Sequence, residues 1–214
     1  MGKVMYSLML DDEVVSIIDK LALKKGTTRS NLVNQILAEH ASYLTPEKKI
    51  DSIFRQMEEI LRMDEGIVPT STPSQSMMSI RSSLEYKYRP TVKYDLRLYR
   101  VQDDGCIGEL SVSVRTRSAE LLQKTEEFFL LWAKFENAYL APIYNKEKIG
   151  HEISPSRMIR KIPIIPGKEY TPKSLGEAIS SYIRIFDSAI KAYAAERLSR
   201  EEIERLFRDR SLVI

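Results

Sequence analysis

The sequence predicts an α+β protein: a strand-helix-helix unit that dimerises, followed by a larger α+β domain with an antiparallel meander and two long helices. Apolar and polar residues alternate in residues 3–10 and again in 84–115, which is the period of β-strands. Elsewhere apolar residues recur every three or four positions, which is the period of helices. We therefore divide the chain into a unit at 1–44, an amphipathic helix at 45–64, a linker at 65–77 and an α+β domain at 78–214.

Composition sets broad limits on the protein. The chain has 214 residues, 43% of them hydrophobic, which leaves room for one ordinary domain and a small one. Its net charge of +3 is too small to indicate a nucleic-acid partner by itself. The single cysteine, Cys106, excludes an internal disulfide and fits a reducing compartment. Because no charged leader and no apolar run of ~20 residues is present, we expect a cytoplasmic protein with no membrane partner.

The first element predicted is a strand from Lys3 to Leu10. A period of two sends alternate side chains to opposite faces. One face is apolar and consists of Val4, Tyr6, Leu8 and Leu10. The other face consists of Lys3, Met5, Ser7 and Met9.

Two helices follow this strand. The first is expected from about Asp12 to Lys25, because carboxylates favour the positive end of a helix and Gly26 supplies a stop signal. Thr28 is a good N-cap for the second helix. Both helices carry an apolar stripe, formed by Val14, Ile17, Ile18 and Leu21 in the first and by Leu32, Val33, Ile36 and Leu37 in the second.

A unit of about 40 residues cannot stand alone, because a single strand has unpaired edges and two short helices cannot enclose a core. The simplest partner is a second copy of the chain. Two strands would then form an antiparallel ribbon, and four helices would cover its apolar face. We therefore expect an obligate homodimer.

The turn between the two helices reads Gly26-Thr27-Thr28-Arg29-Ser30 and is followed by Leu32 and Ile36. Together with the element order, this turn resembles the ribbon-helix-helix family of bacterial DNA-binding proteins of the MetJ, Arc and CopG type. The resemblance covers residues 3–44, a fifth of the chain. It implies that the ribbon lies in the major groove and that the second helix holds a phosphate at its start. The DNA-binding residues expected from this resemblance are Lys3, Met5, Ser7, Met9, Thr28, Arg29 and Ser30.

Physical chemistry supports the phosphate contact more strongly than the base contact. Backbone amides at a helix N-terminus bind anions without a special side chain. On the ribbon, however, only Ser7 and Lys3 can make directional bonds to base edges, whereas Met5 and Met9 can at best touch thymine methyl groups. Residues 1–64 carry nine Lys and Arg against ten Asp and Glu, a net charge of −1. Sequence readout through the ribbon should therefore be weak or unusual.

An amphipathic helix is expected after this unit, starting at Thr45-Pro46-Glu47. Its apolar residues form a seam two heptads long that contains Ile50, Ile53, Met57 and Ile60. The seam has two interpretations: the helix packs on its own domain, or it extends the dimer as a short coiled coil. Residues 66–76 contain two prolines and no charge, which predicts a linker.

The C-terminal domain is expected to hold strands at 84–88, 92–98 and 110–114, with a turn at 102–105. Long helices are expected from Ser118 to about Leu140 and from Thr171 onward, and a capping box at Ser199 starts a last helix. Residues 154–161 concentrate positive charge, which predicts either a plain surface loop or a second anion contact made by Arg157, Arg160 and Lys161.

No catalytic or metal-binding pattern is present in the sequence. The only histidines are His40 and His151, and no phosphate-binding glycine run or metal-ligand spacing occurs. We expect no enzyme activity and no cofactor. The sequence favours a homodimer or higher homo-oligomer that binds double-stranded DNA as a transcriptional repressor, with the C-terminal domain oligomerising, binding an effector or recruiting a protein. The alternatives are a dimerisation or protein-interaction module, as Met5 and Met9 suggest, and a plasmid partition or mobilisation protein.

Overall fold

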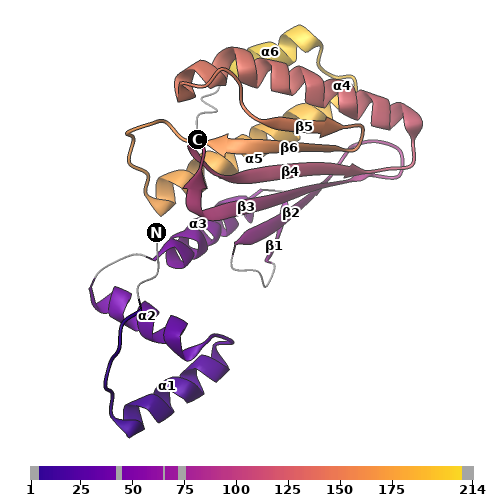
Figure 1. Cartoon of the computed structure of the whole chain (residues 1–214). Coiled ribbons are helices and arrows are strands. Elements are labelled where there is room, and N and C mark those ends of the chain that lie inside the picture. Colours follow the sequence, from indigo (N-terminus) through magenta and orange to yellow (C-terminus); the bar gives the residue numbers. More distant parts are fainter. Residues whose placement is uncertain (1–4, 42–44, 65, 72–75, 209–214) are drawn as a thin grey trace. The chain divides into compact units, whose positions relative to one another are not determined.

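The computed structural model describes residues 5–41, 45–64, 66–71 and 76–208 (Figure 1). The chain separates into two units, residues 1–49 and 50–214. None of the helices described is both long and apolar enough to cross a bilayer. The combination of helices with an antiparallel sheet confirms the predicted α+β class.

The first unit holds α1 (Asp12–Lys24) and α2 (Arg29–His40). These two predicted helices are confirmed, and Ile18, Ala22 and Leu32 form their small buried cluster. The expected strand is absent from the single chain, because residues 5–10 have no regular secondary structure. A strand is defined by hydrogen bonds to a neighbouring strand, and the neighbour that the sequence predicts belongs to a second copy.

The predicted linker at 65–77 is wrong, because part of it is a strand. Residues Val68–Ser71 form β1, which pairs antiparallel with β2 (Met77–Ser83), so that Val68 lies opposite Arg81. β1 is the edge strand of the sheet, the position where a proline such as Pro69 is tolerated. The boundary between the units falls instead near residue 49, inside α3 (Pro46–Leu61).

The apolar seam of α3 packs on the second unit. Ile50, Ile53 and Met57 of the seam are buried in the main hydrophobic core together with Leu61, whereas Ile60 is half-buried. A Cβ added to Gly176 of α5 (Pro172–Ala194) would lie 2.9 Å from Gln56 Cβ, so the two helices approach closely. The seam therefore belongs to the core of its own domain, the first of its two interpretations.

The second unit is built on a six-stranded antiparallel sheet in the order β1-β2-β3-β4-β6-β5 (Figure 1). The remaining strands are β3 (Thr91–Asp103), β4 (Cys106–Arg115), β5 (His151–Ser154) and β6 (Arg157–Pro163). The predicted meander is confirmed at β3 and β4, including the turn at Asp104-Gly105. The first strand of the meander lies at 77–83 and not at the predicted 84–88. Residues 84–90 form the loop to β3, and a hydrogen bond from Leu84 N–H to Pro90 O, 2.9 Å long, closes this loop.

Helices α4 (Ala119–Phe135), α5 (Pro172–Ala194) and α6 (Arg200–Arg208) share one core with the sheet. The expected helix to Leu140 changes at Glu136 into a π-helical turn, η1 (Glu136–Leu140), and then a 3-10 turn, η2 (Ala141–Tyr144). The predicted caps form: the side chains of Ser118, Thr171 and Ser199 each accept a backbone N–H three residues on. The core side chains come from one face of the sheet, and we call the opposite one the outer face.

A charged network is buried between η1, β5 and β6. Arg160 Nε donates to Glu136 Oε1 at 2.8 Å, and His151 Nε2 lies 2.5 Å from Glu136 Oε2. The Arg160 guanidinium lies 4.4 Å from the ring centre of Tyr182, whose hydroxyl accepts from Trp132 Nε1 at 2.9 Å. Burial alone would raise the pKa of Glu136, but the charge of Arg160 and the bond to His151 outweigh it and hold that pKa below its usual value.

We expect Glu136→Gln to destabilise the second unit by about 3–5 kcal/mol, because it leaves the buried Arg160 without its counter-charge. The double variant Glu136→Gln, Arg160→Met removes both charges at similar volume and should recover most of that loss. Urea unfolding, followed through the fluorescence of Trp132, the only tryptophan, measures the free energy of unfolding of both variants.

The same comparison has a pH dependence. A carboxyl whose folded pKa is lowered adds stability above its unfolded pKa of about 4.3, and this stability is lost as the pH falls through the folded pKa. The advantage of the wild type over Glu136→Gln should therefore shrink in acid. If Glu136→Gln unfolds at the same urea concentration as the wild type at neutral pH, the ion pair with Arg160 does not stabilise the second unit.

Candidate nucleic-acid interface

The turn between α1 and α2 has the conformation that its sequence predicts. Gly26 has a φ of +62°, a left-handed conformation that favours glycine. Gly26 N–H donates to Leu23 O at 3.2 Å, and Thr27 N–H donates to Ala22 O at 3.0 Å, which closes α1. Thr28 Oγ1 then accepts from Asn31 N–H at 3.3 Å and caps α2.

The start of α2 is open to solvent. Thr28, Arg29 and Ser30 are all exposed, and the first amides of any helix lack partners one turn earlier. No acidic side chain occupies the first turn of α2. This end of the helix therefore offers backbone donors and a positive dipole to an anion such as a phosphate.

Arg29 is not a free cation at this site. Its Nε donates to Asp19 Oδ1 at 2.5 Å, and its Nη2 also bonds Asp19. These bonds from Arg29 lower the pKa of the Asp19 carboxyl. The pair links α2 to α1, so Arg29 holds the two helices together and its charge is already balanced. Sequence reasoning missed this partner because it assigned Arg29 to DNA and weighed no pairing with an acid ten residues earlier.

The expected ribbon residues that the structure describes are exposed. Met5 is 95% exposed and Met9 is 101% exposed, and Ser7 lies exposed between them. Lys3 lies outside the described residues. The structure therefore leaves the side chains of Met5, Ser7 and Met9 accessible to solvent, like those of Thr28 and Ser30.

Most described residues of the first unit that the sequence assigns to an apolar face are exposed, although Ile18 and Leu32 are buried. Leu8 is 52% exposed, Ile17 57% and Leu37 54%, although each belongs to a predicted apolar face. Five more residues of those faces share this property: Tyr6, Leu10, Val14, Leu21 and Ile36. Packing within the first unit therefore leaves most of the apolar side chains of residues 5–41 uncovered.

The predicted second anion contact is wrong for Arg160. Residues 157–163 form β6, in which alternate side chains point to opposite faces. Arg160 points into the core and is fully buried, so it cannot reach a nucleic acid. Arg157 and Lys161 lie on the outer face, where Arg157 Nε donates to Ser111 Oγ at 2.9 Å and Lys161 Nζ lies 3.2 Å from Glu109 Oε2. Arg160 lies two residues from Met158 and two from Ile162, so a strand places all three on the same face. This spacing is the signal that could have identified Arg160 as buried.

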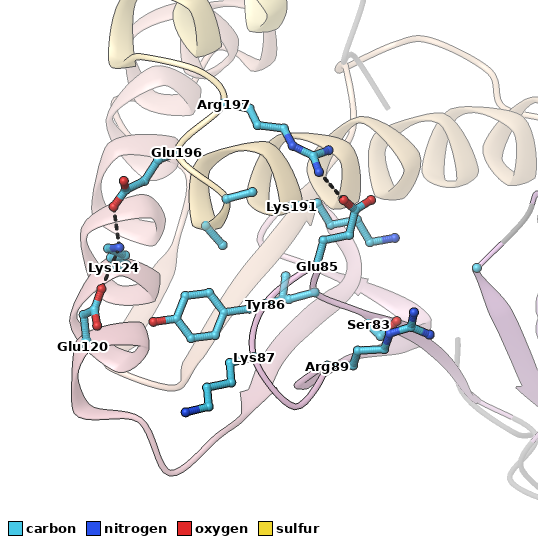
Figure 2. A pocket seen from close by; sticks show the side chains of 14 residues that line it. Ser83, Glu85, Tyr86, Lys87, Arg89, Glu120, Lys124, Lys191, Glu196 and Arg197 are labelled. Carbon is cyan, nitrogen blue, oxygen red and sulfur yellow. Dashed lines mark hydrogen bonds and ion pairs between the residues drawn. The ribbon is translucent and has the colours of Figure 1, made fainter.

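The second unit also has an open groove of about 1120 Å³ (Figure 2). The β2–β3 loop, the start of α4 and the end of α5 line it. Lys124 lies between Glu196 and Glu120 and bonds both, which raises the pKa of Lys124, and Arg197 pairs with Glu85. Most of the charged side chains that line the groove are thus paired with one another. The described residues hold no group of three or more side chains suited to a metal ion.

No family model, curated protein or solved structure matches this chain. The arrangement of its own residues therefore carries the functional argument.

We expect Gly26→Ala to destabilise the first unit by about 1 kcal/mol, because alanine pays a steric cost at this φ while the surrounding space is open. Gly26→Asn is the matched control, since asparagine tolerates the left-handed region better. Thermal unfolding followed by circular dichroism measures both. Equal melting of wild type and Gly26→Ala would show that the turn does not depend on this conformation.

Proposed function

We propose that the chain is a homodimeric protein that binds double-stranded DNA through residues 5–41 in a ribbon-helix-helix arrangement and acts as a transcriptional regulator. The observation that carries the proposal is the uncovered apolar surface of the first unit, with Leu8, Ile17 and Leu37 each more than half exposed. Burying one such side chain completely contributes about 1.5–3 kcal/mol. A unit that leaves so many of them in water favours a partner that covers them.

A second copy fits this surface better than an unrelated partner. The exposed apolar side chains come from the 5–10 segment and from both helices, which are the three elements that a ribbon-helix-helix dimer buries. Residues 6, 8 and 10 alternate with residues 5, 7 and 9, so pairing two segments as an antiparallel ribbon turns all three apolar residues to one face. The ribbon also supplies the backbone partners that a single segment lacks.

DNA is the favoured ligand of this dimer. The opposite face of the ribbon carries Met5, Ser7 and Met9, which are exposed and can enter a groove. Two α2 helices would present two open N-termini, each suited to a phosphate. Phosphate contacts of this kind fix the register of a protein on a duplex, while the ribbon touches base edges.

A dimerisation or protein-interaction module is the second candidate, and two observations favour it. Met5 and Met9 are almost fully exposed apolar side chains on the face that should read bases. Arg29 is neutralised by Asp19 and not held ready for phosphate. The two candidates differ in whether binding depends on salt, because neutralised phosphates release counterions.

The neighbours Ser7 and Leu8 test the ribbon directly, because they lie on opposite faces of it. Leu8→Asp should convert the dimer to a monomer in light scattering and abolish DNA binding. Ser7→Asp should leave the dimer intact but weaken binding to a duplex selected from a random library, since it places a negative charge against the DNA. If both variants behave alike in both assays, residues 5–10 do not form a two-faced ribbon.

Ser30 tests the phosphate contact. Ser30→Glu should stabilise α2 by about 0.3–1 kcal/mol, because an acid favours the helix N-terminus, yet it should repel a phosphate bound there. Ser30→Gln is the neutral control of similar size. We expect anisotropy titrations to show weaker affinity for Ser30→Glu alone, with its melting temperature equal or higher. Equal affinity of the two variants would remove the α2 start from the interface.

A further inference from the structure

The outer face of the sheet in the second unit is unusually basic. No described helix of the second unit covers this face, since the buried side chains of α3 to α6 belong to the core on the opposite face. The charged side chains on it are six basic ones, Arg81, Lys93, Arg97, Arg115, Arg157 and Lys161, and three acidic ones, Asp95, Glu109 and Glu152.

The basic residues are not spread evenly over this face. Arg81 lies opposite Lys93, Lys93 opposite Ser113, and Ser113 opposite Arg157, so one row across four strands carries three cations and no acid. Neighbouring strands lie about 4.8 Å apart, so the row spans about 14 Å. Arg115, two residues after Ser113 on β4, adds a fourth cation beside it. We call Arg81, Lys93, Arg115 and Arg157 the basic band.

Stability of the sheet does not account for this arrangement. Like charges directly opposite each other on neighbouring strands, as at Arg81 and Lys93, are destabilising. Lys93 is balanced by Asp95 at 2.8 Å, and Arg157 donates to Ser111. Arg81 and Arg115 are exposed and have no ion pair with the described residues. Two cations at the band are thus free for an outside anion.

The chemistry of the face favours a nucleic acid over a protein partner. The two rows through Ser79, Ser111 and Ser113 hold mainly polar side chains, and their apolar residues, Val68 and Ile159, lie on different strands and in different rows, whereas protein interfaces are built around an apolar or aromatic centre. Arginine, lysine and serine are the side chains that contact phosphate and sugar. A duplex carries one charge per about 1.7 Å of axis when both strands are counted, so about 14 Å of duplex holds about eight phosphates, of which one side of the duplex presents a part.

From these observations we infer that the basic band is a second contact for the DNA backbone, separate from the N-terminal unit. The inference rests on the proposed function, because it takes double-stranded DNA as the ligand. It assigns the C-terminal domain a role in affinity and not in sequence readout, since phosphate contacts carry no sequence information.

The test compares the full-length wild type with the double variant Arg81→Ala, Arg115→Ala on a duplex selected from a random library with the wild type. Affinity is measured by anisotropy between about 50 and 200 mM salt. We expect weaker binding to every sequence and a salt slope that falls by about one for each phosphate that is no longer neutralised. The matched control is Lys134→Ala, Lys173→Ala, which removes the same charge from exposed positions on α4 and α5 and should leave the slope unchanged.

Each outcome decides between the two sites. An unchanged affinity and slope for the Arg81 and Arg115 variant, with Ser30→Glu still weakened, overturns the band and leaves the N-terminal site in place. Loss of binding in the band variant alone, with Ser30→Glu unaffected, supports the band and removes the N-terminal site. A wild type that binds no duplex at low salt overturns the proposed function and the band together. Equal losses of affinity in the band variant and its control show a net-charge effect, which also overturns the band.

Discussion

A β-strand sends successive side chains to opposite faces, and most of this protein's organisation depends on that constraint. In the second unit it separates Arg160, buried with Glu136 in the core, from Arg157 and Lys161 on the outer face. One face can then be closed by helices while the other stays charged and open. In the proposed ribbon, the same alternation in residues 5–10 would separate an apolar face from Met5, Ser7 and Met9. Each proposed DNA contact on a strand is therefore the solvent face of an element whose other face is apolar.

The two units solve the problem of burying apolar surface differently. The second unit is large enough to enclose a continuous core. In this core Trp132 and Phe186 pack edge to face, with their ring centres 5.1 Å apart. The first unit has only Ile18, Ala22 and Leu32 buried in its described cluster, because two short helices have too little surface to cover each other. The second unit therefore buries most of its apolar side chains within one chain, whereas the first unit leaves many of its own exposed, which is the basis of the proposed dimer.

Local signals in the sequence were sufficient for most helices and for the β3–β4 meander. The caps at Thr28, Ser118, Thr171 and Ser199 predicted where helices begin, because each depends on residues three positions apart. Errors arose where distant residues decide the structure. Proline-rich residues 66–76 resemble a linker, but β2 supplies β1 with a partner. Arg160 resembled an anion ligand, but the fold buries it beside Glu136.

Charge distribution connects the two proposed contacts. Residues 1–49 hold seven Lys and Arg against six Asp and Glu, a net charge of +1, while residues 50–214 hold 26 against 24, a net charge of +2. Non-specific affinity for DNA comes almost entirely from cations that neutralise phosphates, so a nearly neutral first unit supplies little of it. Its α2 start can position a phosphate by backbone donors and dipole, which adds register more than attraction. Because neither unit has a large net charge, the proposed attraction for DNA would depend on local cations, and Arg81 and Arg115 of the second unit are cations that no acid among the described residues balances.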